Sequence, residues 1–489
     1  HWADHGSLAL LEFMSPSLAG AALAAIATSR TGELDPLPRA DRTIELSGLD
    51  AAHLAELIEL HTGTAPSQQT LSEVVARTVG NPFFVAEVAR LLRATGRDDE
   101  PSSWSSALPQ GVRGVLVRRF ARLPQSTHAT MLTASVLGAE VDVTVLAGIM
   151  GDDRDNVLEL LAPAVHAGLL LDLRDGRLRF QHALVRDAAS GELDTAQRRR
   201  LHARAAEVLE ATSGHRSAAA IATHLAAAGD TAAAERWAER AGDQALQAAM
   251  YAEAADWYAR AAEAGTARAA VKHAGALARC GRIAEADQAY AVAIARARAG
   301  GDAESFALAA LGIGTLGGGF EVRLLDSVQL RMLNEALDAI GTDDSALRAM
   351  LLARLSVAST LGAEQARRVV MAEEAVAIAT RVGHAGALAQ SLAAWCDAHA
   401  GPRHTDERRA AAAEMLAAAQ RSGDPELELL ARRFEIVAHM ERGDLPLAWR
   451  AIDAFTELAD RLRQPQFCWF ARLVEGMRAH LRGDLDTAQ

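Results

Sequence analysis

The sequence predicts a mainly α-helical protein that ends in a long array of paired helices. Half of the residues are hydrophobic but only 4% are aromatic, so the apolar side chains are largely Ala and Leu, which favour helices over sheets. Tight turns followed by amphipathic stretches recur through the second half of the chain. With 489 residues, the chain can form about two to four domains with large cores.

The first 60 residues contain one short apolar stretch and one expected helix. Residues 23–27 are apolar and lead into Thr28-Ser29-Arg30. They fit a short buried strand with a polar tip, although their alanines would suit a helix equally well. A helix is expected from residue 51 to about residue 61.

A second helix is expected to start at the string GNPFF, which begins at Gly80. Asn81 can cap this helix, and Pro82 can occupy its first position, where the missing N–H costs nothing. The apolar face of the helix would comprise Phe83, Phe84, Val88 and Leu91.

A linker and a compact domain follow. Residues 96–110 are rich in acidic residues and Ser, which indicates a linker. Helices are expected over residues 112–123, 125–137, 143–150 and 153–166. A β-hairpin comes next and runs into another helix. Three helices and such a wing predict a winged helix within residues 111–213.

The hairpin lies in residues 170–187, LLDLRDGRLRFQHALVRD. Leu171 and Leu173 alternate with polar residues, and Asp175-Gly176 tolerates the positive φ of a tight turn. The four residues after the turn alternate again between polar and apolar, as expected of the returning strand.

The second strand of this hairpin brings His182 to the start of the next helix. Backbone N–H groups at a helix start, together with Arg186, favour an anion such as a phosphate. The alternative is an ordinary histidine whose hydrogen bonds are satisfied by the backbone at the helix start.

Charge disfavours DNA binding by the winged helix. Lys+Arg 50 against Asp+Glu 63 gives a net charge of −13, which argues against a nucleic-acid surface over most of the chain. The helix that would enter the major groove begins with DDRD at residues 152–155 and carries Glu159, and these carboxylates repel phosphates. DNA contacts are therefore expected only from a domain outside residues 1–489.

Residues 214–489 predict helical repeats of the tetratricopeptide type. The turns that start successive helices lie at Gly229, Met250, Gly281 and Gly443. Their spacing is irregular, although Gly483-Asp484 repeats the last of these turns 40 residues later. The Gly-rich residues 311–320 are expected to interrupt the array as a loop or hinge. Such arrays bind peptides, proteins or small inducers on a concave side, and the sequence does not distinguish these ligands.

Six aromatic residues recur at the packing positions of the repeats. They are expected in the interhelical core rather than in a ligand cage: Trp237, Trp257, Tyr258, Trp395, Trp449 and Trp469.

Cysteine usage and hydropathy indicate a soluble, cytoplasmic protein that makes no membrane contact. Cys280, Cys396 and Cys468 are far apart and match no disulfide or metal-site spacing, so we expect reduced, buried thiols and no metal site. No apolar run approaches the roughly 20 residues that span a bilayer.

Several strings occur in the order found in one known family. HWAD at residues 1–4, TSR at residues 28–30 and GNPFF precede RFQHALVR at residues 179–186. This order resembles STAND-class signalling ATPases, in particular the large LuxR-type regulators, in which an ATPase module precedes a winged helix and tetratricopeptide repeats. The resemblance implies that residues 1–95 are the C-terminal part of a P-loop ATPase module of the AAA/STAND type, with its sensor strand and helical lid.

The resemblance also implies a nucleotide site. Arg30 would reach the terminal phosphate, which suits a planar and permanently charged donor. Gly80, Asn81 and Pro82 would form the lid motif beside the adenine, and His182 would sense the phosphates. The implied cofactor is ATP or ADP with Mg²⁺, bound by the full-length protein only.

The chain lacks a Walker A motif, because its one lysine, Lys272, does not follow a Gly-rich loop. The Walker B acids are expected just before His1. The sequence opens on His1 and stops after the turn at Gly483-Asp484, so we expect a piece of a longer protein. No catalytic residue is expected in this piece, and the full-length protein would be at most a slow regulatory ATPase.

The resemblance implies an ATP-binding, nucleotide-switched signal-transduction protein of the LuxR family that regulates transcription. Its repeats would sense an unknown inducer or protein, and its output, a helix-turn-helix DNA-binding domain, would lie outside residues 1–489. Two alternatives stay open: an ATPase–repeat protein with a nucleotide cyclase output, and a protein-binding repeat scaffold without nucleotide. A stand-alone hydrolase is unsupported, because the sequence has neither a nucleophile elbow nor an HExxH motif.

Overall fold

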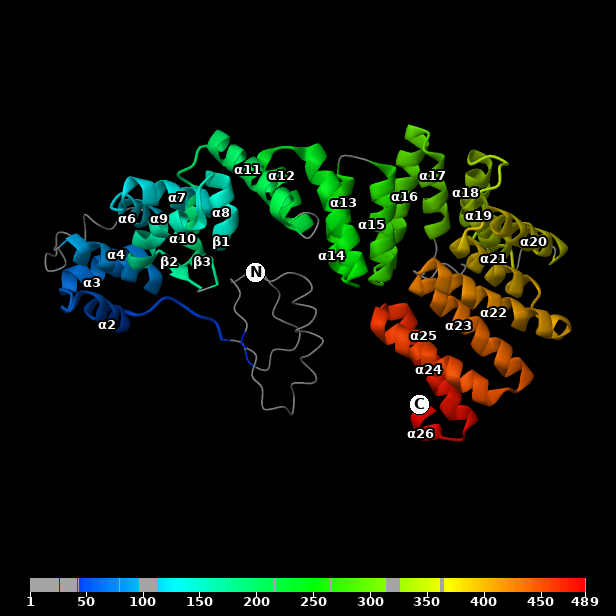
Figure 1. Cartoon of the computed structure of the whole chain (residues 1–489). Helices are drawn as coiled ribbons and strands as arrows, with labels where there is room; N and C mark the ends of the chain where they lie inside the picture. Colours follow the sequence, from blue (N-terminus) through cyan, green and yellow to red (C-terminus); the bar gives the residue numbers. More distant parts are fainter. Residues whose placement is uncertain are drawn as a thin grey trace. The chain divides into compact units, whose positions relative to one another are not determined.

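The computed structural model describes Ile26, Arg42 and residues 44–78, 80–95, 112–173, 175–213, 217–263, 266–313, 326–360 and 365–488 (Figure 1). Within these ranges regular structure is almost entirely helical, with one three-stranded sheet, which confirms the predicted mainly α class. The described residues form two compact units that divide between Ala234 and Glu235. This boundary falls inside helix α13 (Thr231–Gln247).

The first unit begins with a helical cluster made of α2 (Ala51–Thr62), α3 (Gln68–Thr78) and α4 (Pro82–Thr95). Helix α2 starts where the Asp50 carboxylate accepts the His53 N–H at 2.9 Å and ends at Gly63, whose φ is +87°, so the helix expected from residue 51 is confirmed. The core of the cluster comprises Leu54, Ile58, Val74, Phe84, Val85 and Ala89.

The next part of the first unit has the topology of a winged helix. Its elements are α6 (Val112–Phe120), α7 (Gln125–Ser135), β1 (Glu140–Asp142), α8 (Val143–Met150), α9 (Arg154–His166), β2 (Leu170–Asp172), β3 (Arg177–Phe180) and α10 (Ala183–Ser190). The strands form an antiparallel sheet in the order β1-β3-β2. The helices expected from the sequence are all present, whereas the three-residue strand β1 was not expected.

The wing confirms the predicted turn but corrects the register of its first strand. Gly176 has a φ of +79°, as the Asp175-Gly176 turn requires. Leu170 pairs with Phe180, and both are buried. Leu171 is only partly buried, because it pairs with Arg179 on the opposite face of the sheet.

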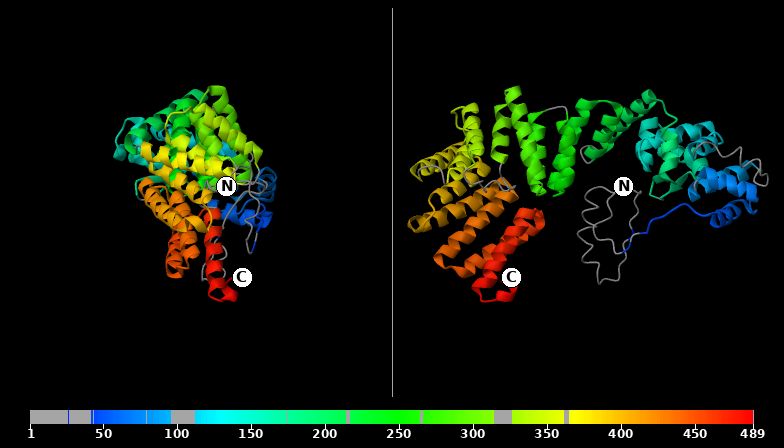
Figure 2. Two further views of the ribbon diagram at one scale, coloured as in Figure 1. Left: turned by 90° about the vertical axis from the view of Figure 1, so that its right-hand side faces the viewer. Right: turned by 180° about the vertical axis from the view of Figure 1, so that it is seen from behind.

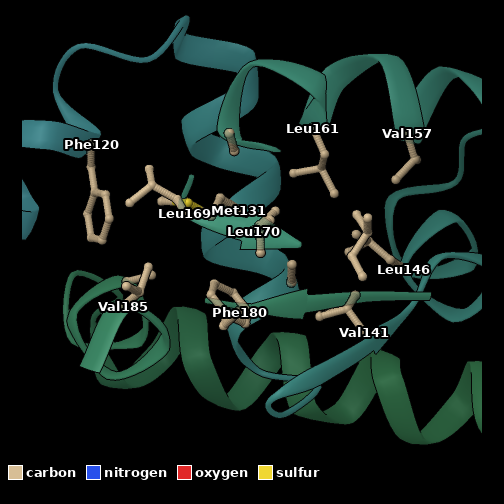
Figure 3. Packing of buried hydrophobic residues seen from close by; sticks show 14 of the residues in the cluster. Phe120, Met131, Val141, Leu146, Val157, Leu161, Leu169, Leu170, Phe180 and Val185 are labelled. Carbon is tan, nitrogen blue, oxygen red and sulfur yellow. The ribbon is translucent and has the colours of Figure 1, made fainter. Parts of the chain in front are cut away.

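Large apolar side chains fill the core of the winged helix (Figure 3). Phe120, Met131, Leu146 and Leu161 are fully buried there. The sheet contributes Phe180 from β3. This core fixes the position of the helix start that carries His182.

Two further helices, α11 (Thr195–Ser213) and α12 (Ala218–Ala228), pack against each other. Helix α11 also contacts α8, where a Cβ at Gly148 would lie 2.7 Å from Val208 Cγ1. This spacing allows only a glycine, so α11 and α8 approach closely.

The second unit is an array of helices (Figure 2). After α13 they are α14 (Tyr251–Ala262), α15 (Ala267–Arg279), α16 (Ile283–Gly300), α17 (Ala303–Gly312), α18 (Ser327–Ala339), α19 (Ala346–Ala358), α20 (Gln365–Val382), α21 (Ala385–Ala398), α22 (Thr405–Ser422), α23 (Pro425–Arg442), α24 (Leu445–Leu462), α25 (Pro465–Leu481) and α26 (Leu485–Ala488). From α14 onward consecutive helices pack on each other, and α19 contacts α21 as α21 contacts α23. This stacking is that of an α-solenoid.

The last part of the array repeats every 40 residues, since α20, α22 and α24 begin at residues 365, 405 and 445. Gly443 and Gly483, with φ of +74° and +77°, start equivalent turns, which confirms their predicted correspondence. The expected loop over residues 311–320 is partly wrong, because Leu311 and Gly312 complete helix α17. Its remaining residues after Ile313 lie outside the described part of the chain.

No described helix is long and apolar enough to cross a membrane. Likewise, the described residues contain no cluster of three or more His, Cys, Asp or Glu side chains that could hold a metal ion.

Candidate functional site

The structure brings two of the predicted site segments together at the starts of α4 and α10. The ring of Phe83, in the GNPFF string, stacks on the imidazole of His182 with a centroid distance of 4.2 Å and an interplanar angle of 23°. These residues are about a hundred positions apart in the sequence. The predicted sensor residue Arg30 lies outside the described residues.

Gly80 is explained by backbone packing. Its φ is +74°, and its carbonyl accepts the Leu49 N–H at 2.8 Å. A Cβ at this position would lie 2.5 Å from the Leu49 carbonyl oxygen, so no larger residue fits. This glycine therefore fixes the entry into α4 whether or not a nucleotide binds nearby.

Asn81 and Pro82 start α4 as the sequence predicts. The Asn81 Oδ1 accepts the N–H groups of Phe83 at 3.0 Å and Phe84 at 3.3 Å. Pro82 occupies the first helical position, where it removes no hydrogen bond. Both residues are exposed, so they remain accessible to a ligand at the helix start.

His182 caps α10 with its side chain. Its Nδ1 accepts the Leu184 N–H at 3.2 Å, and its backbone is extended, with φ −150° and ψ 148°. Because Nδ1 accepts a hydrogen bond, the proton of the neutral imidazole is on Nε2. The backbone thus satisfies one ring nitrogen, as expected for an ordinary histidine at a helix start. The other ring nitrogen is then a donor.

The expected contribution of Arg186 to an anion site is reduced by a neighbour. Its Nη2 and Nε lie 2.6 and 3.0 Å from Asp187 Oδ1. This carboxylate partly neutralises the guanidinium charge. The positive potential near His182 therefore depends mainly on the starts of α4 and α10.

A buried ion pair, which was not expected from the sequence, holds α4 against α6. Glu87 and Arg119 contact each other, with side-chain exposures of 1% and 9%, and the Arg119 guanidinium also donates to the Ala167 carbonyl. Burial lowers the pKa of Arg119 to about 10, so it stays charged at neutral pH. The sequence signal was an acidic residue inside an otherwise apolar helix face.

Phe83 also packs on the winged-helix core. The stack with His182 and the Glu87–Arg119 pair therefore form one junction between the helical cluster and the winged helix. Phe83 and Glu87 both belong to α4. A movement of α4 that broke the ion pair would therefore also disturb the ring stack.

Helix α9, the would-be recognition helix, and the two residues before it present acidic side chains to solvent. Asp152, Asp153, Asp155 and Glu159 are all exposed. Asp153 also caps the helix by accepting the Asn156 N–H at 2.8 Å. This surface would repel a phosphate backbone.

Comparisons with known proteins give only distant similarity. No family model matches this chain, and no curated protein matches it. One similar solved structure is a STAND protein with a tetratricopeptide repeat sensor from Pyrococcus horikoshii, at 11% identity and a TM-score of 0.35, covering 91% of this chain and 71% of that chain. Another is a Rap protein complexed with competence and sporulation factor, at 12% identity and a TM-score of 0.40, covering 75% and 95%. At these scores neither likeness shows what this chain binds.

Proposed function

We propose that the chain is the regulatory part of a nucleotide-switched signalling protein. The observation that carries this proposal is the Phe83–His182 stack, because it brings the Asn81-Pro82 helix start and the histidine that caps α10 together at one junction. A nucleotide phosphate beside the junction would accept the Nε2–H of His182 and interact favourably with the positive ends of both helices. Such a contact would hold the winged helix against the helical cluster.

In this proposal the winged helix is an intramolecular sensor and not a DNA reader, on account of the carboxylates on α9. The repeat array receives a peptide, protein or small inducer and changes the stability of the junction. A DNA-binding output belongs to another domain. A repeat scaffold without nucleotide is the competing function, and the stacked solenoid of the second unit favours it equally.

The test uses the natural full-length protein. It measures how nucleotide changes hydrogen exchange at the junction. ADP with Mg²⁺ should slow hydrogen exchange in α4 and α10. His182→Asn should abolish that protection, because Asn can still cap the helix but cannot reach the phosphate. His384 offers a matched control, since its Nδ1 caps α21 by accepting the Ala387 N–H at 3.1 Å.

His384→Asn should therefore leave the ADP effect unchanged. If His182→Asn retains full protection by ADP, His182 is only a capping residue and the sensing role is wrong. Calorimetry provides a second check, because residues 1–489 contain no phosphate-loop lysine and are expected to bind ATP or ADP weakly or not at all. Micromolar ATP binding to this chain alone would contradict the proposal.

A further inference from the structure

The first helices of the repeat array contact its last helices. The Tyr251 hydroxyl, at the start of α14, donates to the Leu462 carbonyl, at the end of α24, at 3.0 Å. Arg279, at the end of α15, donates from Nε and Nη2 to the two carboxylate oxygens of Glu426 on α23, at 2.5 and 3.0 Å. Helices far apart in the sequence are thus joined by direct polar contacts.

Trp469, on α25, lies beside this contact. Its side chain is 60% exposed and lines a surface pocket together with Ile283 of α16. The expectation that Trp469 lies in the interhelical core is therefore wrong, because its face of α25 opens on this pocket.

A second cavity, of about 240 Å³, lies within the array. Its walls come from α15, α16, α17, α19, α21 and α23. Typical ligand pockets have volumes of about 300–1,000 Å³, so this cavity suits a small metabolite.

Gln390, on α21, places a polar side chain in the cavity wall where other repeats have an apolar one. Helices α21, α23 and α25 begin at residues 385, 425 and 465, so Gln390 is equivalent to Leu430 and Phe470. Gln390 is half-buried, and within the described part of the chain its amide has no hydrogen-bond partner. The stacking of the helices therefore does not require this amide.

Arg354, on α19, is a second polar exception in the wall. Ser356 and Cys396 each contact the backbone carbonyl of the residue twelve positions later, which makes Arg354 equivalent to the buried Ala394. Arg354 is only 5% exposed. A guanidinium has five N–H donors, so it can donate to a ligand in the cavity besides its contacts within the protein.

The two carboxylates of the wall are already bound by donors of the protein. Glu426 accepts both hydrogen bonds from Arg279, so these two charges compensate each other. Asp424 is exposed and caps α23, because its Oδ1 accepts the Glu426 N–H at 2.9 Å and the Leu427 N–H at 3.3 Å. The buried donor that remains in the wall is the guanidinium of Arg354.

Tyr290, on α16, adds a hydroxyl to the wall. Its side chain is 7% exposed, and its hydroxyl has no hydrogen-bond partner among the described residues. Burial raises the pKa of Tyr290 to about 12, so the hydroxyl stays protonated and can donate. A Cβ at Gly275, which also lines the cavity, would lie 3.6 Å from this hydroxyl, so the glycine keeps the space beside it open.

We propose that this cavity binds a small organic carboxylate. The carboxylate accepts hydrogen bonds from the guanidinium of Arg354, the amide N–H of Gln390 and the hydroxyl of Tyr290. Its apolar tail packs against Leu308 and Leu430, which also line the cavity. This assignment rests on the proposed function in taking the array as the part that receives an inducer, but binding itself needs no nucleotide.

The same wall disfavours two other kinds of ligand. A phosphate ester carries more negative charge than a carboxylate and would meet the repulsion of Asp424 and Glu426. A neutral amide would direct its own N–H donors towards the N–H and O–H donors of the wall, and it lacks the charge that strengthens a hydrogen bond to a guanidinium.

The first test uses residues 1–489 without nucleotide and a pair of probes of equal size, isocaproate and isocaproamide. Calorimetry should show isocaproate binding in the millimolar range and isocaproamide binding about tenfold more weakly. Isocaproate should also slow hydrogen exchange in α19 and α21, which supply Arg354 and Gln390. This comparison needs no protein variant.

Single substitutions then locate the site. Arg354→Gln should remove the preference for the acid over the amide, whereas Arg409→Gln, at an exposed position of α22, should keep it. Tyr290→Phe and Gln390→Leu should each weaken isocaproate binding by about threefold to tenfold. Neither change removes a hydrogen bond within the described part of the chain, so both variants should fold even if Arg354→Gln does not.

Equal binding of acid and amide by the wild-type protein would overturn the proposal. So would unchanged isocaproate affinity in both Tyr290→Phe and Gln390→Leu, or no isocaproate binding well above millimolar concentrations. Because no nucleotide is present, a failure here leaves nucleotide switching at the junction intact with another inducer. A failure of the His182→Asn experiment likewise leaves the carboxylate site intact.

Discussion

The winged helix and the repeat array are both mainly helical, but side chains of different size hold them together. In the winged helix, Phe120, Met131 and Leu161 are fully buried and interlock in one core. In the array most buried positions are alanines; in α21 they include Ala387, Ala389, Ala393, Ala394 and Ala398. The winged helix thus depends on the volume of a few side chains, whereas the array depends on close approach of many helices.

Close approach in the array leaves little space beside its few large rings. A Cβ at Gly242 would lie 2.5 Å from the Tyr258 ring, and one at Gly312 would lie 2.2 Å from the Tyr290 ring. Polar contacts also link helices of the array. Asp243 Oδ1, for example, accepts both the Tyr258 hydroxyl at 2.6 Å and the ammonium of Lys272 at 2.8 Å.

The largest effect is expected from emptying the winged-helix core. Phe120→Ala should lower the free energy of unfolding of the first unit by about 3–5 kcal/mol, because a large buried ring leaves a cavity. Hydrogen exchange of residues 112–190 should accelerate accordingly. Phe455→Ala, at a buried ring in α24, should act mainly on nearby repeats, since each repeat contacts its neighbours. Global unfolding of the array by Phe455→Ala would contradict the comparison.

A second test concerns a histidine pair between α11 and α12, in which His224 is buried and His202 is half-buried. His202 Nδ1 and His224 Nδ1 lie 2.8 Å apart, and burial together with the charge of His202 lowers the pKa of His224 to about 4. Burial and Arg198 also lower the pKa of His202. The folded state therefore binds protons less readily than the unfolded state. The folded state has its full stability above about pH 6.5, where both histidines are neutral, and loses stability as the pH falls towards 4.

Protonation of His224 should lower the free energy of unfolding of the first unit by roughly 2–3 kcal/mol over this pH window. Urea unfolding between pH 7 and pH 4 measures this loss. His224→Asn keeps a polar group near His202 but does not titrate, so its stability should depend less on pH. An identical pH dependence in wild type and His224→Asn would assign the acid sensitivity to other groups.

The close packing of the array predicts a moderate cost for one added methyl group. Gly242→Ala and Gly312→Ala should each destabilise the second unit by about 1–3 kcal/mol, because the Tyr rings must move. Gly300, at the end of α16, has nothing within 4 Å of its added Cβ, so Gly300→Ala should instead stabilise by about 0.5–1 kcal/mol. Thermal unfolding of the three variants shows whether each is less or more stable than the wild-type protein.

Local patterns in the sequence were sufficient for much of the fold. Asn81-Pro82 and Asp175-Gly176 each act within a few residues, and both form the predicted cap and turn. The register of the first wing strand was missed because Leu170 and Leu171 are equally apolar, and only pairing with β3 decides which is buried.

The candidate site was predictable only in part. The order of the motifs predicted which residues belong to the site. The contact between Phe83 and His182 and the ion pair of Glu87 with Arg119 join separate helices, so no local pattern encodes them. The exposure of Trp469 depends on where α25 meets α15, which is likewise a tertiary property. The role of Arg30 stays a prediction, since this residue lies outside the described part of the chain.

The smallest effect separates the two histidine caps, one in each unit. His182 and His384 both accept a backbone N–H through Nδ1, and Asn is a good capping residue, so His→Asn should preserve the cap in both. His182 also stacks on Phe83, and aromatic pairs contribute about 0.5–1.5 kcal/mol beyond burial. His182→Asn should therefore destabilise the first unit by about that amount, whereas His384→Asn should be nearly neutral. Phe83→Leu should remove the difference, because the ring partner is then absent, and this can be followed by urea unfolding. If His182→Asn is as neutral as His384→Asn, the stack does not stabilise the junction, and α4 is held against the winged helix by the Glu87–Arg119 pair with α6 and by the apolar core alone.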